Sequence, residues 1–308
     1  MEDVERAQTR LDNIRTVEPI LEALRTISLG GWKAAIKQAA GVREYADRLG
    51  AMLPSLAPHL PASRRVGHEQ APTPERIAVL VVGSERGLCG RFNAAVTERA
   101  ERHVAEREAA GATVELMALG TQTMRILRRG GTSPAWSRAT SVAALPPYSL
   151  ALSLTRRWLA RYEEHELDAV DLVYNAYRGT ARYEPTTNRL IPWTLRALVM
   201  GPSHASPQTN ATASENWPPP IVETDPVSLY TRIVEQWTAT SLYGLLLDSA
   251  AAEHSTRFQL MEAASQNADR LITELTLAVQ TARQQRITQE MQELAAGAGL
   301  VGPQQKGD

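Results

Sequence analysis

Residues 242–278 read LYGLLLDSAAAEHSTRFQLMEAASQNADRLITELTLA, and this stretch decides the fold prediction. Between Asp225 and Ala296 the sole glycine is Gly244, and no proline follows Pro226. About 70 helical residues at ~1.5 Å each would extend roughly 105 Å, a length that favours a coiled coil over a globular helix. The seam positions recur at steps near three and four, although several are polar. They are Leu242, Leu246, Ser249, Glu253, Thr256, Leu260, Ala263, Asn267, Leu271, Glu274 and Ala278.

The N-terminal segment, from Val4 to Leu56, has a similar helical pattern in two stripes that do not share one register. Pro19 and the pair Gly30-Gly31 interrupt it. An interior proline costs ~3 kcal/mol in a helix and a glycine about 1 kcal/mol relative to alanine. We therefore expect this first helix to be kinked or divided near these residues.

The middle of the chain alternates between two kinds of segment. Continuous apolar runs at Ile77–Gly83, Thr113–Gly120 and Ala169–Tyr177 predict buried strands, and the segments between them predict helices. Leu190–Leu198 is a further candidate strand, which Pro192 would confine to an edge. Alternating strands and helices predict a small parallel or mixed sheet.

The predicted fold is therefore α/β: a long antiparallel coiled coil of the N- and C-terminal helices, with a small Rossmann-like α/β domain inserted between them. Two end helices separated by a compact domain can pair and bury faces that neither could bury alone. The expected division is an N-terminal helix (1–57), a linker (58–76), the α/β domain (77–200), a flexible loop (201–224), a C-terminal helix (225–301) and a tail (302–308).

The composition argues against several classes of partner. The 308 residues carry a net charge of −1, which gives no reason to expect nucleic acid or an anionic membrane surface. A single cysteine excludes an internal disulfide and is typical of a reducing compartment. The beginning MEDVERAQTRLDNIR has no apolar signal segment, and no window approaches about 18 uninterrupted apolar residues. We expect a soluble, cytosolic protein that meets a membrane only through partners.

Gly83, Gly87 and Gly90 follow an apolar run and precede a predicted helix, which is the outline of a phosphate-binding turn. Their spacing of four and three differs from the two and three of a Rossmann fingerprint, and the Gly-Lys-Ser/Thr of a P-loop is absent. None of the eight tyrosines has a lysine four residues later, as short-chain dehydrogenases require. We interpret the segment as a structural strand-to-helix turn, with a nucleotide-binding enzyme as the weaker alternative.

No other constellation predicts catalysis, a metal or a cofactor. The six histidines form no i,i+4 pair and have no cysteine companions, and there is no Gly-x-Ser-x-Gly elbow. Cys89 lies near Arg86 and Arg91, which could lower the pKa of its thiol. The simpler interpretation of Cys89 is a small apolar residue packed in the turn. We therefore expect no catalytic site in this chain.

Three segments together carry a family resemblance. GSERGLCGRFNAAV (83–96) resembles the signature turn of the γ subunit of F-type ATP synthases. The run 251–301 is similar to that family's C-terminal helix, and the N-terminal helix is similar in position and length. The matching positions are Glu253, His254, Arg257, Met261, Ala264, Asn267, Leu271, Ile272, Leu275, Ala282, Arg283, Gln284, Ile287, Thr288, Gln289 and Glu290.

The resemblance implies a central rotor without catalytic chemistry of its own. In the family, the two end helices form an antiparallel coiled coil inside a ring of α and β subunits, and the α/β domain contacts the ε subunit and the membrane ring of c subunits. Rotation drives the catalytic β subunits through their conformations, which couples ion flow to ATP synthesis. The chain would be peripheral, on the cytoplasmic side of the cell membrane, with no cofactor.

The resemblance also assigns roles to individual residues. Arg283, Gln284, Thr288 and Glu290 would contact a loop of the β subunit and transmit torque. Leu294, Leu300 and Val301, in the small apolar tip, would turn in a hydrophobic bearing. Gly83, Arg86, Gly87, Gly90 and Asn93 would form the structural turn.

The chain also departs from the family pattern. Family members usually carry lysine and methionine in the segment that reads EALRTIS here (22–28), and Pro19 with Gly30-Gly31 would soften a shaft. These departures keep a second function open, a γ-like scaffold or regulator that is not coupled to ATP synthesis.

Overall fold

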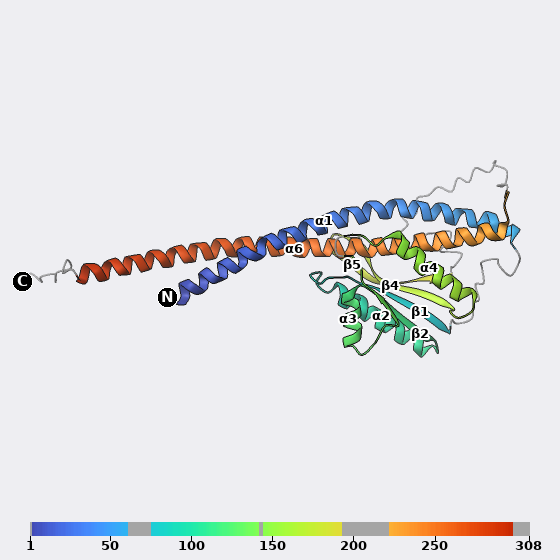
Figure 1. The fold of residues 1–308 in the computed structure, drawn as a ribbon, viewed down its shortest axis with the longest axis horizontal. Helices are drawn as coiled ribbons and strands as arrows, with labels where there is room; N and C mark the ends of the chain where they lie inside the picture. Colours follow the sequence, from blue (N-terminus) through green and yellow to red (C-terminus); the bar gives the residue numbers. More distant parts are fainter. Residues whose placement is uncertain (1, 61–74, 142–143, 193–221, 298–308) are drawn as a thin grey trace, which may run out of the picture. The chain divides into compact units, whose positions relative to one another are not determined.

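Two long helices, one at each end of the element order, are separated in the sequence by a mixed sheet with its own helices (Figure 1). The structure is a computed structural model and describes residues 2–60, 75–141, 144–192 and 222–297. The elements are α1 (Glu2–Leu56), η1 (Ala57–His59), β1 (Arg76–Val82), α2 (Phe92–Ala109), β2 (Thr113–Leu119), α3 (Thr121–Arg129), β3 (Trp136–Arg138), α4 (Tyr148–Glu163), β4 (Ala169–Gly179), β5 (Arg182–Ile191) and α6 (Pro226–Gly297).

The sheet has five strands in the order β3-β2-β1-β4-β5. β1 pairs in parallel with β2 and β4, so Val79 faces Leu116 on one side and Asp171 on the other. β5 pairs antiparallel with β4, which makes the sheet mixed. The three strands predicted from apolar runs are β1, β2 and β4, because central strands buried on both faces need such runs.

The prediction for the edge strand was wrong in its bounds. β5 is Arg182–Ile191 and not 190–198; residues 193–198 lie outside the described part of the chain. β5 is exposed or half-buried from Arg182 to Arg189 and buried only at Leu190 and Ile191, in keeping with its place at the edge of the sheet. The turn that connects it to β4 uses left-handed backbone at Gly179 and Ala181, and this turn fixes the antiparallel pairing.

The contacts between residues divide the chain into two units, residues 27–259 and residues 1–26 with 260–308. In the first unit, each face of the sheet has a helical cover (Figure 1). Ile77, Val79 and Val81 of β1 pack against α2 and α3, while Ala78, Leu80 and Val82 pack toward α4 and α6. α6 contributes Leu242, Tyr243, Leu245, Leu246 and Leu247 to that second core.

Within the same unit, α1 and α6 pair in opposite directions. The end of α1 contacts the beginning of α6 through a shared apolar cluster that includes Leu53 and Trp237. Earlier in α1, Val42 lies near Gly244, and Gly31 lies against His254. The partners on α6 therefore come later in the sequence as those on α1 come earlier, which is an antiparallel arrangement.

The expected division of the first helix is wrong. α1 is one continuous helix from Glu2 to Leu56, through Pro19, Gly30 and Gly31. Packing against a partner helix stabilises a helix more than local propensity does, so it can offset the ~3 kcal/mol cost of an interior proline. Gly31 has a packing role, because only a residue without a side chain leaves room for the His254 ring.

The second unit contains the beginning of α1 and the last part of α6. Arg25 and Glu262 form an ion pair at 2.5 Å, and Arg283 Nη2 donates to Gln8 Oε1 at 3.4 Å. The last turns of α6 extend past the beginning of α1 (Figure 1). Most of the expected linker and loop, and the whole tail, lie outside the described residues.

Candidate functional site

The glycine-rich turn (residues 83–91) joins β1 to α2 and is closed by Ser84 and Asn93. The Ser84 backbone N–H donates to Asn93 Oδ1 at 2.9 Å, and Asn93 Nδ2 donates back to Ser84 Oγ at 2.8 Å. The Ser84 hydroxyl donates to the Arg86 carbonyl at 2.6 Å. Both Ser84 and Asn93 are buried, so these bonds are shielded from water and hold the turn in one conformation.

Two of the three glycines meet different requirements. Gly90 has a φ of 58°, a left-handed conformation that glycine adopts without strain. At Gly83 a β-carbon would lie 1.6 Å from Thr123 Oγ1, so no side chain fits. Gly120, at the beginning of α3, also packs too closely for a side chain, since a β-carbon there would lie 2.5 Å from the Gly83 carbonyl oxygen. Thr123 of α3 therefore packs directly against the turn at Gly83.

Glu85 occupies the position at α3 where an anion would bind. Its carboxylate accepts from the backbone N–H groups of Thr121 at 3.2 Å and Thr140 at 2.9 Å, and from the Thr121 hydroxyl at 2.5 Å. Burial alone would raise the pKa of Glu85, but these hydrogen bonds outweigh it and hold the pKa below its ordinary value. The chain therefore supplies its own negative charge to this helix N-terminus.

Cys89 is a packed residue of the turn. Its side chain is buried beside Phe92 and Ala252, and its sulfur accepts from Asn93 Nδ2 at 3.3 Å. Burial raises the pKa of the Cys89 thiol. The nearby arginines therefore do not produce a reactive thiolate, in agreement with the simpler interpretation of this cysteine.

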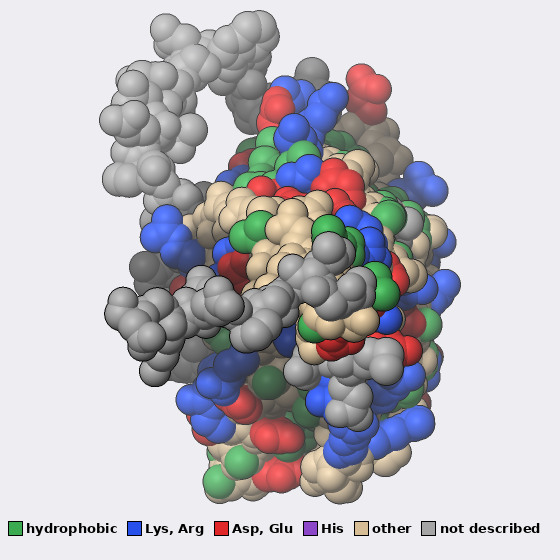
Figure 2. All heavy atoms as spheres, turned by 90° about the vertical axis from the view of Figure 1, so that its left-hand side faces the viewer, with side chains coloured by type: hydrophobic (Ala, Val, Ile, Leu, Met, Phe, Trp, Pro, Cys, Tyr) green, Lys and Arg blue, Asp and Glu red, His purple; other side chains and the backbone are tan. Residues whose placement is uncertain are grey.

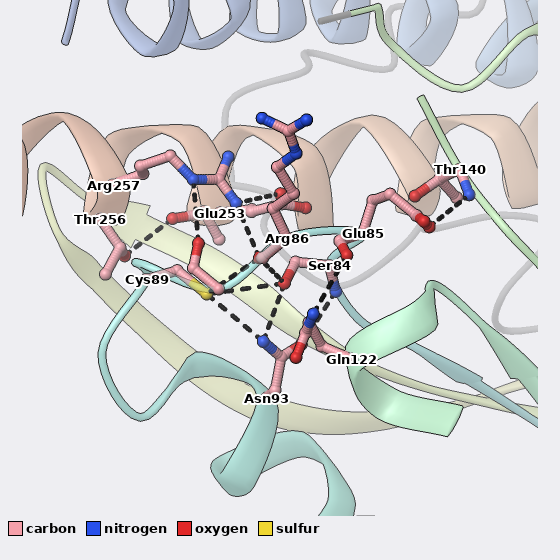
Figure 3. A network of polar contacts seen from close by, with 12 residues as sticks. Ser84, Glu85, Arg86, Cys89, Asn93, Gln122, Thr140, Glu253, Thr256 and Arg257 are labelled. Carbon is pink, nitrogen blue, oxygen red and sulfur yellow. Dashed lines mark hydrogen bonds and ion pairs between the residues drawn. The ribbon is translucent and has the colours of Figure 1, made fainter. Parts of the chain in front are cut away.

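α6 contacts the turn through a buried arginine (Figure 3). Arg257 Nη2 donates to the Arg86 carbonyl oxygen at 3.2 Å, and Arg257 Nε donates to the Gly87 carbonyl oxygen at 3.4 Å. The same Nη2 lies 2.7 Å from Glu253 Oε1, one helical turn earlier. We call this set, Arg257 with Glu253 and the two carbonyl groups, the turn anchor.

The turn anchor is buried. Arg257 is only 4% exposed. Burial raises the pKa of Glu253, and the adjacent guanidinium opposes that shift. Sequence reasoning matched Glu253 and Arg257 to the family but did not connect them with the turn. The contact joins residues 170 positions apart, and no local pattern encodes such a distance.

The predicted coupling residues share one exposed segment of α6. Arg283, Gln284, Thr288 and Glu290 are all exposed. The Thr288 hydroxyl donates to the Gln284 carbonyl oxygen at 2.9 Å, and Glu290 accepts from Arg286 at 2.9 Å. Arg286, which sequence reasoning did not select, therefore orients Glu290.

The end of α6 exposes apolar side chains. Leu294 is 73% exposed, Met291 66% and Ile287 57%. Leu300 and Val301 lie outside the described residues.

Figure 2 shows hydrophobic, basic and acidic side chains interspersed on the face that it draws. In the described part of the chain, no helix combines the length and apolarity needed to cross a bilayer.

Comparison with known proteins identifies the family. A family model described as ATP synthase matches residues 3–300. The ATP synthase gamma chain of Rubrobacter xylanophilus is 33% identical over 304 residues, which cover 97% of each chain. The chain belongs to the ATP synthase gamma chain family. Another family member, the gamma chain of Trichlorobacter lovleyi, is 27% identical over 98% of this chain and 99% of that one.

Solved structures of ATP synthases share this fold. A chain from the Euglena gracilis mitochondrial ATP synthase (OSCP/F1/c-ring) aligns with a TM-score of 0.61 at 12% identity, and covers 100% of this chain and 99% of that one. A chain from the central stalk/c-ring structure of the Tetrahymena thermophila enzyme aligns with a TM-score of 0.54 at 18% identity, over 80% and 99%. At these identities the likeness concerns the fold alone.

Proposed function

We propose that this chain is the central rotor, or γ, subunit of an F-type ATP synthase. It couples ion flow through a membrane ring to conformational changes in catalytic β subunits. Membership of the gamma chain family supports this role, and so do the structural relatives, which come from central-stalk and F1/c-ring assemblies. Its partners are the α, β and ε subunits and the c-ring, and it reaches the cytoplasmic side of the membrane only through them.

One observation carries the proposal. A single helix, α6, both completes the core of the α/β domain and continues beyond residue 259 as a partner of α1. Such a continuous helix can pass torque from a domain at one end to subunits around the other. We propose that α1 and α6 pair as an antiparallel coiled coil with a Rossmann-like domain inserted between them. We propose for it the domain boundaries expected from the sequence.

The distal part of α6 is the proposed coupling surface. The side chains of Arg283, Gln284 and Glu290 are exposed and can form directional hydrogen bonds with a loop of the β subunit, together with Thr288. Leu294, with Leu300 and Val301, forms the apolar bearing. An apolar surface can turn in a hydrophobic collar because its contacts are non-directional.

The chain contributes no catalytic site, metal or cofactor in this proposal. Nucleotide chemistry belongs to the β subunits, and the glycine-rich turn is structural. The contacts of Glu85 and Thr123 support this interpretation, because they join the turn to the chain's own helix α3.

The alternative function, a γ-like scaffold, was motivated by Pro19 with Gly30-Gly31 and by the altered segment 22–28. α1 runs without a break through Pro19, Gly30 and Gly31, so the first of these motives is weakened. The rotor therefore remains the better supported function.

The decisive experiment is reconstitution with α and β subunits. We expect the chain to co-purify with both and to raise their multi-site ATP turnover. Arg283→Ala should lower this turnover while assembly persists. Arg270→Ala is the matched control, because Arg270 is also exposed on α6 but bonds to its own helix, with Nη2 donating to Asn267 at 2.8 Å. A folded chain that does not assemble with α and β would contradict the proposal.

A further inference from the structure

The turn anchor lies where α6 leaves the α/β domain. Along α6, the contacts with that domain come in order: Leu242–Leu247 in the sheet core, then Asp248, whose carboxylate accepts from the Tyr177 backbone N–H at 3.1 Å. Ala252 follows, beside Cys89 and Phe92, and then Arg257. The unit that contains the domain ends at Gln259, only two residues later.

The contacts before Arg257 are mostly apolar packing, apart from the hydrogen bond of Asp248. At Ala252 the helix contacts Cys89 and Phe92 through dispersion alone, which has no preferred direction. The guanidinium of Arg257 is planar, and its hydrogen bonds weaken when the donors leave their aligned positions. The turn anchor therefore restrains twisting of α6 against the domain at this point.

The acceptors of the turn anchor are themselves held in place. The Arg86 carbonyl also accepts from the Ser84 hydroxyl, and Ser84 is bonded to Asn93 at the beginning of α2 (Figure 3). A displacement of Arg257 thus acts on β1 and α2 through a short series of buried hydrogen bonds. It does not end in a side chain that can rotate away.

We infer that Arg257, oriented by Glu253, is a positioning residue that transfers torque between the α/β domain and α6. This inference rests on the proposed rotor function and adds to it the point where the load enters α6. Without the anchor, α6 can twist against the domain, so part of the rotation is lost before it reaches the catalytic subunits.

The test uses the assembled synthase in membrane vesicles, with ATP hydrolysis and ATP-driven ion uptake measured on the same preparation. For Arg257→Ala we expect hydrolysis to stay within about twofold of wild type and the ions moved per ATP to fall about threefold or more. Arg156→Ala is the matched control. Arg156 of α4 also pairs with a glutamate of α6, Glu235, at 2.9 Å, but its side chain is 61% exposed, and the ratio should not change.

Two conservative variants separate torque transfer from folding. Arg257→Lys keeps the buried positive charge but lacks the planar, fixed N–H geometry of the guanidinium, and should lower the ratio less than the alanine variant. Glu253→Gln keeps the carbonyl contacts and should have a smaller effect still. If Arg257→Ala does not assemble, Arg257→Lys decides the question by the same ratio.

The two proposals fail in different ways. An assembled Arg257 variant with a wild-type ratio of ions to ATP would overturn the positioning role and leave the rotor function intact. A wild-type chain that does not assemble, or that assembles without supporting ion uptake, would overturn the rotor function itself.

Discussion

The imidazole ring of His254 lies directly against Gly31, where a β-carbon on residue 31 would come 2.7 Å from His254 Cε1. At the adjacent Gly30, no atom lies within 4 Å of the position that a β-carbon would take. Two neighbouring glycines in one helix therefore have opposite roles. Gly31 makes room for a buried ring of the partner helix, and Gly30 only lowers helix propensity.

Gly31→Ala should lower the free energy of unfolding by about 1–3 kcal/mol, because the new methyl group overpacks the interface with His254. Gly30→Ala should raise it by up to about 1 kcal/mol, since alanine favours a helix and meets no atom there. Denaturant unfolding of the two variants, side by side, measures the difference. Equal effects from both substitutions would show that the contact with His254 does not restrict residue 31.

His254 should make the stability depend on pH. Burial, together with the charge of Arg257, lowers the pKa of His254 to about 4, whereas an unfolded histidine titrates near about 6.5. Between these pH values the unfolded chain binds more protons than the folded chain, so a falling pH favours unfolding. The free energy of unfolding therefore keeps its full value above pH ~6.5 and decreases by up to about 3 kcal/mol as the pH falls below it.

The measurement is denaturant unfolding of wild type and His254→Gln between about pH 7.5 and about pH 5. Because glutamine does not titrate, the pH dependence of all other groups cancels in the difference between the two proteins. The free energy of unfolding of wild type should therefore fall, relative to that of His254→Gln, as the pH falls. Parallel curves for the two proteins would contradict the burial of a neutral imidazole at this position.

The buried carboxylate of Asp171 joins three elements. It lies 2.9 Å from His103 Nε2 of α2, and accepts from Arg189 Nε of β5 at 2.6 Å. Burial would raise the pKa of Asp171, but its bonds with His103 and Arg189 outweigh it and lower the pKa. Asp171→Asn should therefore lower the free energy of unfolding by about 3–5 kcal/mol, because it leaves a cation without its partner.

Asp168→Asn is the control for this carboxylate. Asp168 also pairs with an arginine, Arg76, at 2.9 Å, but the Asp168 side chain is 30% exposed against 2% for that of Asp171, so the effect should be far smaller. Thermal unfolding of the two variants gives the comparison. If Asp171→Asn unfolds at the wild-type temperature, the Asp171 carboxylate does not secure β5 to the sheet.

Cys89 should resist alkylation in the folded protein. Its side chain is buried and its thiol has a raised pKa, so iodoacetamide should react more than about 100-fold slower than with free cysteine near pH 8. Leu88→Cys in a Cys89→Ser background provides an accessible comparison, because Leu88 is 59% exposed. Similar rates at the two positions would show that the turn opens in the native state.

The sequence predicted those parts of the fold that depend on apolar periodicity. β1, β2, β4 and α6 were all evident, because a strand or helix buried on a long face needs an apolar pattern along its whole length. β3 has three residues and β5 lies at an edge, so neither needs such a pattern. Pro19 and Gly31 were misleading because local propensity was weighed without the partner helix.

The site was less predictable for a related reason. Gly83 and Asn93 were selected from the resemblance, but the sequence gives no sign that Thr123 fills the space beside Gly83 or that Glu85 reaches α3. Both contacts arise from packing between segments that are distant in the chain. In the described part of the chain, the hydrogen bonds of the exposed residues 283–290 reach only α1 and α6 themselves. Their proposed roles toward another subunit therefore remain predictions.

The part that α6 plays in the sheet core also has a consequence for synthesis on the ribosome. Leu242, Leu246 and Leu247 cover one face of β1 and β4, yet they are translated long after every strand of the sheet. Until they emerge, that apolar face has no complete cover and exposes a surface prone to aggregation. The nascent chain therefore depends on its final third, and during that interval a chaperone would find its binding surface on the α4 side of the sheet.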